Sequence, residues 1–246
     1  MKWYKIEDAI GLYGTGLNPD GSPSQYKGNI HSKGMAILGV QRSKGSLDIQ
    51  FWDYYIDNIL NAGFIQVDYK QNKWIGGVQY LGEDPHNDGG SEDVSQAYYP
   101  PDQQTSLFSF RFGRQVNDFN LTANYTTIPG KGRFLFPREF GREQFYTTIG
   151  RGRPEGMGEA KTFMLKAHWI PKSHPELSIE VDAGRTWTPG FENVELNKYY
   201  ADSYDQYNLD VRYQFSGIWQ GPVIRFLYVH NRLESVQKSV SLNLVI

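Results

Sequence analysis

A segment near the middle of the chain concentrates the side chains best suited to chemistry with charged groups. It comprises the run FPREFGRE at 136–143 and the arginines that follow it. The charged residues concerned are Arg138, Glu139, Arg142, Glu143, Arg151 and Arg153. Glu139 and Glu143 could in principle act as the acid and base of a glycosidase. Guanidinium groups beside a carboxyl lower its pKa, which opposes the general-acid role, so the segment does not favour an enzyme.

The sequence lacks the other motifs that commonly mark catalysis or metal binding. It has no G-x-S-x-G, P-loop or H-E-x-x-H motif, its five histidines are scattered, and cysteine is absent. Acidic residues at 84–93 could offer oxygen ligands to Ca²⁺, but their spacing differs from that of an EF-hand. A solvated loop is the favoured interpretation there. We therefore predict a protein that is not an enzyme and has no cofactor or metal.

Composition narrows the class of protein further. The 246 residues suffice for one large domain or two small ones, and the net charge of −2 gives no general attraction to nucleic acid. No stretch approaches the roughly 18 consecutive apolar residues of a membrane helix, which leaves a membrane β-barrel open because its strands alternate. Residues 1–8 have no apolar core and are not a secretory signal. We expect a signal peptide to have been removed, or an N-terminal part to be missing.

Short alternating segments frame the charged segment and recur along the chain. Residues 119–126 and 161–169 lie on either side of it, and no convincing amphipathic helix occurs. After an irregular segment at 1–32, the strand candidates are 35–42, 47–55, 65–70, 74–81, 107–112, 119–126, 161–169, 177–183, 207–215, 224–231 and 239–246. The chain therefore reads as an all-β protein with strands from 33 to 246.

The connections between these strands alternate in length. Short turns near 44, 72, 117, 174 and 217 interleave with connections that are often much longer. The longest are predicted outer loops at 83–104, 128–159 and 188–204. Short turns at one end and long loops at the other are typical of an outer-membrane barrel.

The strand at 207–215 shows which face meets which surroundings. One face is wholly apolar or aromatic, and the other carries Asn208, Asp210, Arg212 and Gln214. Burying Asp210 and Arg212 in a dry core would cost several kcal/mol per ion. The charged face could instead be the solvated side of a sheet, a water-filled lumen or a ligand groove. Aromatic residues at both ends of several strands favour the lumen, because they match the two membrane interfaces.

Basic and acidic residues collect on the polar faces. The predicted lumen carries Lys70, Arg111, Lys166, Arg212 and Arg225, together with acidic residues that include Asp210. Such a lumen would orient a small zwitterion or carboxylate. Strand 224–231 fits least well, because Leu227 and Val229 would share the face of Arg225. A bulge or a contact with a plug would explain that exception.

Several motifs along the chain form a set: 136–143 with 151–156, LNKY at 196–199, YNLDVRY at 207–213, FWDYY at 51–55 and QVDY at 66–69. The resemblance that they carry is to the OprD-type family of outer-membrane specific porins. It implies the Gram-negative outer membrane, passive uptake of small solutes that often bear a carboxylate, a basic ladder along the channel, and loops folded inward to narrow it. It makes the segment from Arg138 to Arg153 the expected solute-screening element, at the mouth or constriction.

The expected architecture is an antiparallel up-and-down transmembrane β-barrel. The chain would supply about 11–12 strands of a larger barrel of about 18 strands, because porins with an aqueous channel have 16–18. Residues 1–32 would be a loop segment left from a missing N-terminal part. Outer-membrane lipid, lipopolysaccharide and small solutes are the expected partners, with a homotrimer as one candidate assembly. The alternatives are a soluble β-sandwich that binds carbohydrate through exposed Trp and Tyr, and a structural surface protein without transport.

Overall fold

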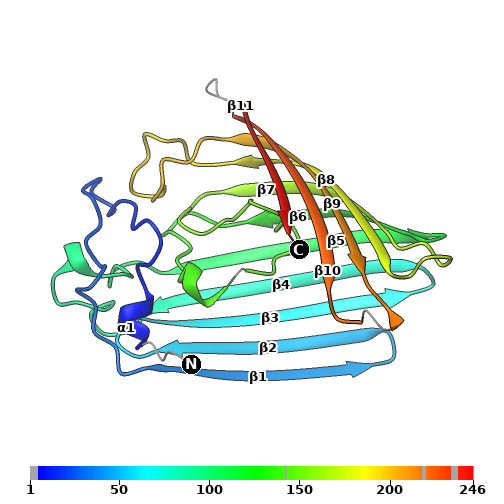
Figure 1. Cartoon of the computed structure of the whole chain (residues 1–246). Coiled ribbons are helices and arrows are strands. Elements are labelled where there is room, and N and C mark those ends of the chain that lie inside the picture. Colours follow the sequence, from blue (N-terminus) through cyan, green and yellow to red (C-terminus); the bar gives the residue numbers. More distant parts are fainter. Residues whose placement is uncertain (1–4, 142, 218–219, 234–237, 246) are drawn as a thin grey trace.

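Eleven strands form a single antiparallel sheet in which each strand pairs with the next one along the chain (Figure 1). The computed structural model describes residues 5–141, 143–217, 220–233 and 238–245. The strands are β1 (Met35–Lys44), β2 (Leu47–Ile56), β3 (Leu60–Gln71), β4 (Trp74–Pro85), β5 (Thr105–Val116), β6 (Phe119–Thr127), β7 (Lys161–Trp169), β8 (Leu177–Trp187), β9 (Tyr204–Gln214), β10 (Val223–Leu233) and β11 (Lys238–Val245). The predicted all-β, up-and-down fold is confirmed.

Among the named elements of the described residues, the helical pieces are short. They are α1 (Ile6–Ala9) and the 3₁₀ turns η1 (Val94–Gln96) and η2 (Arg138–Phe140). In the part of the chain that the structure describes, no helix has both the length and the apolar character needed to cross a membrane.

The two ends of the sheet differ because their turns differ. Two-residue turns join β3 to β4 at Asn72-Lys73 and β5 to β6 at Asn117-Asp118, and Asn72, Lys73 and Asn117 have positive φ. Asparagine tolerates that conformation, which suits the twist of a tight hairpin. The opposite end carries the long connections 86–104, 128–160 and 188–203, together with the N-terminal segment 5–34 (Figure 1).

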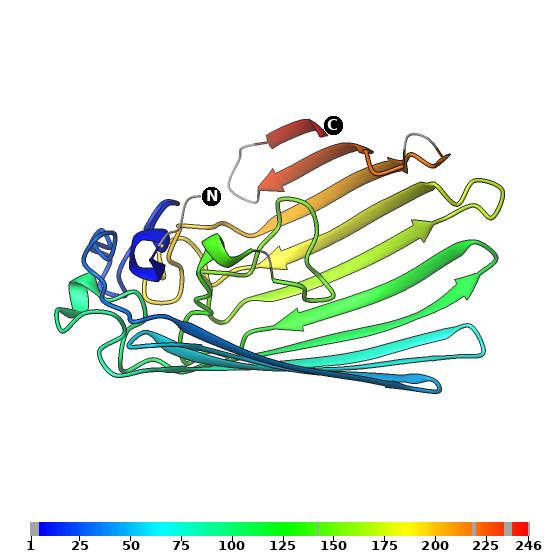
Figure 2. The ribbon, with the colours of Figure 1, turned by 60° about the horizontal axis from the view of Figure 1, so that its bottom comes forward.

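The sheet is curled rather than flat (Figure 2). Its concave face is polar and its convex face is apolar. Large apolar side chains remain exposed on the convex face of every strand from β1 to β10, among them Val40, Phe51, Ile65, Tyr80, Phe112, Leu121, Leu165, Val181, Tyr207 and Phe226. A protein whose sheet packs against a second layer in water buries its apolar face instead. All strands of the described residues belong to one sheet, so the β-sandwich alternative is wrong.

The exception in β10 has a simple cause. Leu227 and Val229 share the concave face with Arg225 and are only 6% and 2% exposed. The register of β10 with β9 continues without interruption from Val223 to Leu233, so a bulge does not account for them. The loop 128–160 folds over the concave face, and a Cβ atom at Gly150 would lie 2.9 Å from Leu227 Cδ2. A contact with an inward loop therefore explains the two apolar residues.

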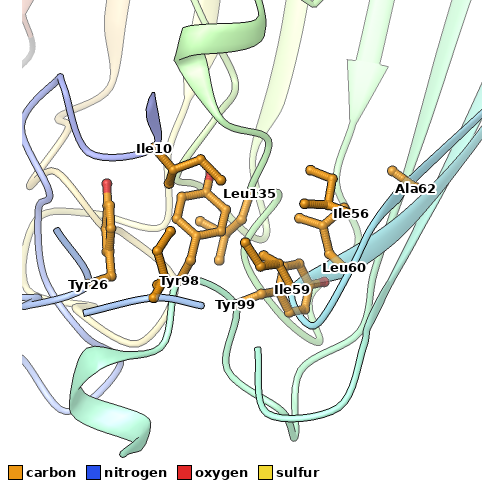
Figure 3. Packing of buried hydrophobic residues seen from close by; sticks show 10 residues of the cluster. Ile10, Tyr26, Ile56, Ile59, Leu60, Ala62, Tyr98, Tyr99 and Leu135 are labelled. Atoms are coloured by element: carbon orange, nitrogen blue, oxygen red, sulfur yellow. The ribbon is translucent and has the colours of Figure 1, made fainter. Parts of the chain in front are cut away.

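Two apolar clusters hold the long-loop end together. The first joins the N-terminal segment, the β2–β3 turn and the loops 86–104 and 128–160; Figure 3 shows Ile10, Tyr26, Ile56, Ile59, Leu60, Ala62, Tyr98, Tyr99 and Leu135. The second comprises Leu81, Leu107, Ile128, Phe134, Phe145, Met157 and Ala160. Burial of apolar surface, at about 25 cal/mol per Å², fixes these loops and the N-terminal segment against the sheet.

Candidate functional site

The concave face is hollowed into a cavity of about 1340 Å³. Its lining includes every residue that the sequence predicts for the lumen: Lys70, Arg111, Lys166, Asp210, Arg212 and Arg225. They come from β3, β5, β7, β9 and β10, because alternate residues of each strand point to this face. The sheet therefore gathers both signs of charge around one space.

Asp210 is the centre of a compact charged cluster. Arg225 donates to it from Nε and Nη2, at 2.9 Å to Oδ1 and 2.6 Å to Oδ2, and Arg212 Nη2 lies 2.7 Å from Oδ2. Arg212 and Arg225 are direct cross-strand partners, so Asp210 offsets the repulsion between their guanidinium groups. The carboxylate is 5% exposed, whereas the side chain of Arg212 is 51% exposed. Arg212 is thus the most exposed member of the cluster, since the side chain of Arg225 is 29% exposed.

The remaining predicted lumen cations make different contacts. Arg111 forms an ion pair with Asp68, and Lys166 Nζ donates to the carbonyl of Thr148 at 2.9 Å. Lys70 is exposed near the short-turn end of the cavity. Arg111 and Lys166 therefore also bond to other parts of the protein, Arg111 to Asp68 and Lys166 to the loop carbonyl of Thr148.

Residues 144–150 of the loop lie across the concave face and bond to its side chains. Side chains of β4, β7 and β9 donate to the loop's backbone carbonyls: Gln79 to Gln144 at 3.0 Å, Lys166 to Thr148, and Gln206 and Asn208 to Gly150 at 2.6 and 2.9 Å. The hydroxyl of Thr147 bonds that of Thr126 on β6 at 2.7 Å. The loop is therefore bonded to four strands of the wall, β4, β6, β7 and β9.

The arginine and glutamate residues of the predicted constriction lie mostly beside the cavity rather than on its lining. Arg138 donates to Glu155 at 2.6 Å and stacks over Tyr199, with its Cζ 4.1 Å from the ring centroid. Burial alone would lower the pKa of Arg138, but Glu155, Tyr199 and Glu143 together outweigh that effect and raise it. Arg153 Nη2 lies 2.6 Å from Oε1 of Glu143, which does line the cavity.

The other members of the predicted constriction are dispersed. Glu139 accepts from the backbone N–H of Gly11 at 2.9 Å and so binds the N-terminal segment. Arg151 is exposed and adopts a positive φ of 68°. Arg142 lies outside the described residues. The role of these residues at a constriction remains a prediction.

Arg133 is a structural residue that the sequence did not single out. It is 2% exposed and donates to four carbonyls, those of Leu17, Asn18, Val194 and Glu195. Burial lowers its pKa to about 10. One guanidinium thus joins the N-terminal segment and the loop 188–203 to the loop 128–160. Sequence offers no signal for it, because a buried arginine and an exposed one look alike in a loop.

Lys198 is the second such residue. Its ammonium lies 4.9, 4.8 and 5.4 Å from the ring centroids of Tyr26, Tyr98 and Tyr199, and 3.7 Å from Glu155 Oε1. Burial lowers the pKa of Lys198, with Glu155 acting in the opposite direction. Cation–π attraction to three rings supports a charge that water cannot reach.

The acidic loop at 83–104 is organised by the protein itself. His86 bonds the hydroxyl of Tyr55 at 2.6 Å, and Asp93 accepts from the backbone N–H of Ser95 at 3.0 Å. Within the described ranges, no group of three or more His, Asp or Glu side chains is placed to hold a metal ion.

Comparison with known proteins places this architecture among solved porins. No protein-family profile matches the chain, and no curated protein matches it in sequence. Its structure is similar to that of Acinetobacter baumannii OccAB4, with a TM-score of 0.63 and 14% identity over 85% of this chain and 51% of that one. Pseudomonas aeruginosa OccD3 (OpdP) gives 0.65 and 14% over 85% and 55%, and OccK8 (OprE) gives 0.63 and 14% over 93% and 58%.

These structures are OprD-type (Occ) porins. The chain spans little more than half the length of each. At this identity the likeness concerns the fold, and the resemblance seen in the sequence motifs is confirmed at that level. The chain therefore has the fold of the OprD-type outer-membrane porins.

Proposed function

We propose that this chain forms part of the wall and an inward loop of an outer-membrane channel. The channel would serve the passive diffusion of small solutes in a Gram-negative bacterium. The observation that carries the proposal is the placement of the two faces. The convex face exposes apolar and aromatic side chains, and the concave face encloses a charged cavity. An apolar outside and a polar inside suit lipid around the barrel and water within it. Outer-membrane lipid and lipopolysaccharide would be its surroundings, and a homotrimer a candidate assembly.

The solutes we propose are small and bear a carboxylate, either alone or within a zwitterion. Arg212 and Arg225 present two guanidinium groups at one place, and guanidinium groups match carboxylate geometry. Asp210 and Glu180 lie on the same lining and would attract an ammonium group of the same solute. Mixed charges of this kind orient a solute as well as attract it.

The test is conductance of the full-length protein reconstituted in planar lipid bilayers, with ion preference read from the reversal potential. Asp210→Asn removes one negative charge beside two guanidinium groups. At about 5 Å in water that charge is worth about 0.8 kcal/mol, so we expect roughly fourfold greater anion preference. Asp118→Asn is the matched control, because Asp118 lies in a short turn with its carboxylate 3.5 Å from Lys172 Nζ.

Two results would contradict the proposal. One is a chain that stays monodisperse in buffer without detergent, because an exposed apolar belt would aggregate there. The other is inserted full-length protein without conductance or liposome flux, which would favour the structural surface protein. A conducting channel in which Asp210→Asn and Asp118→Asn behave alike would keep the pore but remove the charged cluster from solute selection.

A further inference from the structure

One row of three residues crosses the sheet under the inward loop. Asp68 of β3 pairs with Gly77 of β4, and Gly77 pairs with Arg111 of β5. Neighbouring strands are about 4.8 Å apart, so Asp68 and Arg111 are separated by about 10 Å at their Cα atoms. Their side chains nevertheless form an ion pair, because the glycine between them leaves the space above it open.

Tyr146 of the loop occupies that space. Its hydroxyl donates to Asp68 Oδ1 at 2.8 Å, and Arg111 Cζ lies 4.2 Å from the centroid of its ring. A Cβ atom at position 77 would lie 2.3 Å from the Tyr146 hydroxyl oxygen and 2.7 Å from Asp68 Oδ1. Burial and the hydrogen bond to Asp68 raise the pKa of Tyr146, so the hydroxyl keeps its proton and remains a donor.

Gln79 sets the backbone of the loop at the same place. It lies two residues beyond Gly77 on the same face of β4 and is 1% exposed. Its amide donates to the carbonyl of Gln144 at 3.0 Å and accepts from the N–H of Tyr146 at 3.1 Å. The backbone of the loop is therefore held on both sides of Phe145, and the side chain of Tyr146 is directed at the row of Asp68, Gly77 and Arg111.

We propose that Tyr146, seated over Gly77 between Asp68 and Arg111, is the positioning residue that locks the inward loop to the wall. The charge of Arg111 then serves this lock rather than the solute. In the lock, Arg111 neutralises Asp68, Asp68 accepts from Tyr146, and the ring of Tyr146 covers the guanidinium. The consequence for solute passage rests on the proposed function, whereas the lock itself does not.

The lock can be tested by cysteine accessibility, because the chain has no cysteine of its own. Thr147→Cys places a reporter beside Tyr146 at a position that is 7% exposed. Its rate of reaction with a charged methanethiosulfonate is measured in detergent micelles. Tyr146→Phe removes a hydrogen bond to a charged acceptor, so labelling should accelerate roughly tenfold to a hundredfold. Gly77→Ala, which leaves no room for the hydroxyl, should accelerate it at least as much.

Two controls separate loop release from unfolding. Gly76→Ala adds the same methyl group to the neighbouring residue of β4, where nothing lies within 4 Å of the added atom, and should leave the rate unchanged. Ala62→Cys, at a position that is fully buried in the first apolar cluster, should stay unreactive in every variant. If Gly77→Ala also makes the cysteine at position 62 reactive, that variant has unfolded, and the result for Tyr146→Phe alone tests the lock. A labelling rate within twofold of the parent in Tyr146→Phe would overturn the lock.

Conductance adds a readout of the charge in this row of residues, and that readout rests on the proposed function. Asp68→Asn leaves Arg111 without its counter-charge, so the open channel should become more anion-preferring, while Gly76→Ala should not. The two proposals fail separately. Accelerated labelling without any conductance would support the lock and contradict the channel, and a conducting channel with unchanged labelling would do the reverse.

Discussion

Replacing Arg133 by methionine should release the N-terminal segment from the rest of the molecule. Methionine keeps much of the length and the apolar stem of the side chain but has no donor. The carbonyls of Leu17, Asn18, Val194 and Glu195 would lose their shared partner. Two of these belong to the N-terminal segment and two to the loop 188–203.

The size of the effect follows from two opposing contributions. A buried acceptor left without a partner costs about 1–3 kcal/mol, and four acceptors are involved, some of which water will reach once the segment loosens. Removing the guanidinium also removes the cost of burying a charge, which is several kcal/mol. The difference is about 2–4 kcal/mol. This predicts an open fraction of the segment that rises about thirtyfold to a thousandfold.

Cleavage at Lys27 by a lysine-specific protease measures that open fraction. Lys27 is exposed in a segment whose neighbours Tyr26 and Ile30 are buried, so cleavage requires local opening. Arg114→Met is the matched control, because Arg114 is exposed and stacks over Trp74, with its Cζ 5.0 Å from the ring centroid. Cleavage of Arg133→Met at the parental rate would refute the view that this guanidinium joins the segments.

Three further predictions concern other parts of the molecule. Leu165→Arg on the convex face should cost about 2–4 kcal/mol of stability in bilayers, measured by urea unfolding, while Thr122→Arg on the cavity lining should cost far less. Gly150→Val should lower the free energy of unfolding by about 1–3 kcal/mol, because the larger side chain overpacks against Leu227, and the melting temperature should fall with it. Gly63→Ala should change neither quantity. Burial lowers the pKa of Lys198, so the unfolded chain binds more protons and the unfolding free energy should rise as pH approaches 10.5; Lys198→Met should flatten that rise.

The sequence predicts where the strands lie and which of their side chains share a face. Both follow from the alternation of polar and apolar residues with a period of two. The strand at 207–215 alternates without a fault, and its polar face is the concave face of the structure. The strand boundaries lengthened by several residues in the structure, for example from 107–112 to 105–116 in β5. Sheet pairing supplies those end residues, and pairing leaves no local trace in composition.

The contacts of the loops were not accessible from sequence. Arg138, Glu139 and Arg153 were identified as charged residues, but their partners Glu155, Gly11 and Glu143 lie from 10 to 128 residues away along the chain. Such pairings are set by the docking of one loop on another, which no short-range pattern encodes. A Gly-Gly pair inside β4 is a local sequence signal of one such contact. Glycine inside a strand marks the close approach of another group, and in this molecule that group is Tyr146.

The wall and the loop of this molecule are best understood as one polar system. A porin wall made only for solutes would leave its cations accessible, yet Arg111 pairs with Asp68, and Lys166 donates to a loop carbonyl. The loop in turn has backbone and side-chain groups at 144–150 that need partners, and polar side chains of the wall supply them. The same alternation that separates the apolar face from the polar face therefore supplies the donors that hold the loop. Substitutions on the concave face should consequently divide into two groups. Changes at Asp210, Arg212 and Arg225 should alter ion preference with the loop in place. Changes at Gln79 and Asp68 should alter loop accessibility, and at Asp68 a change in ion preference should accompany it.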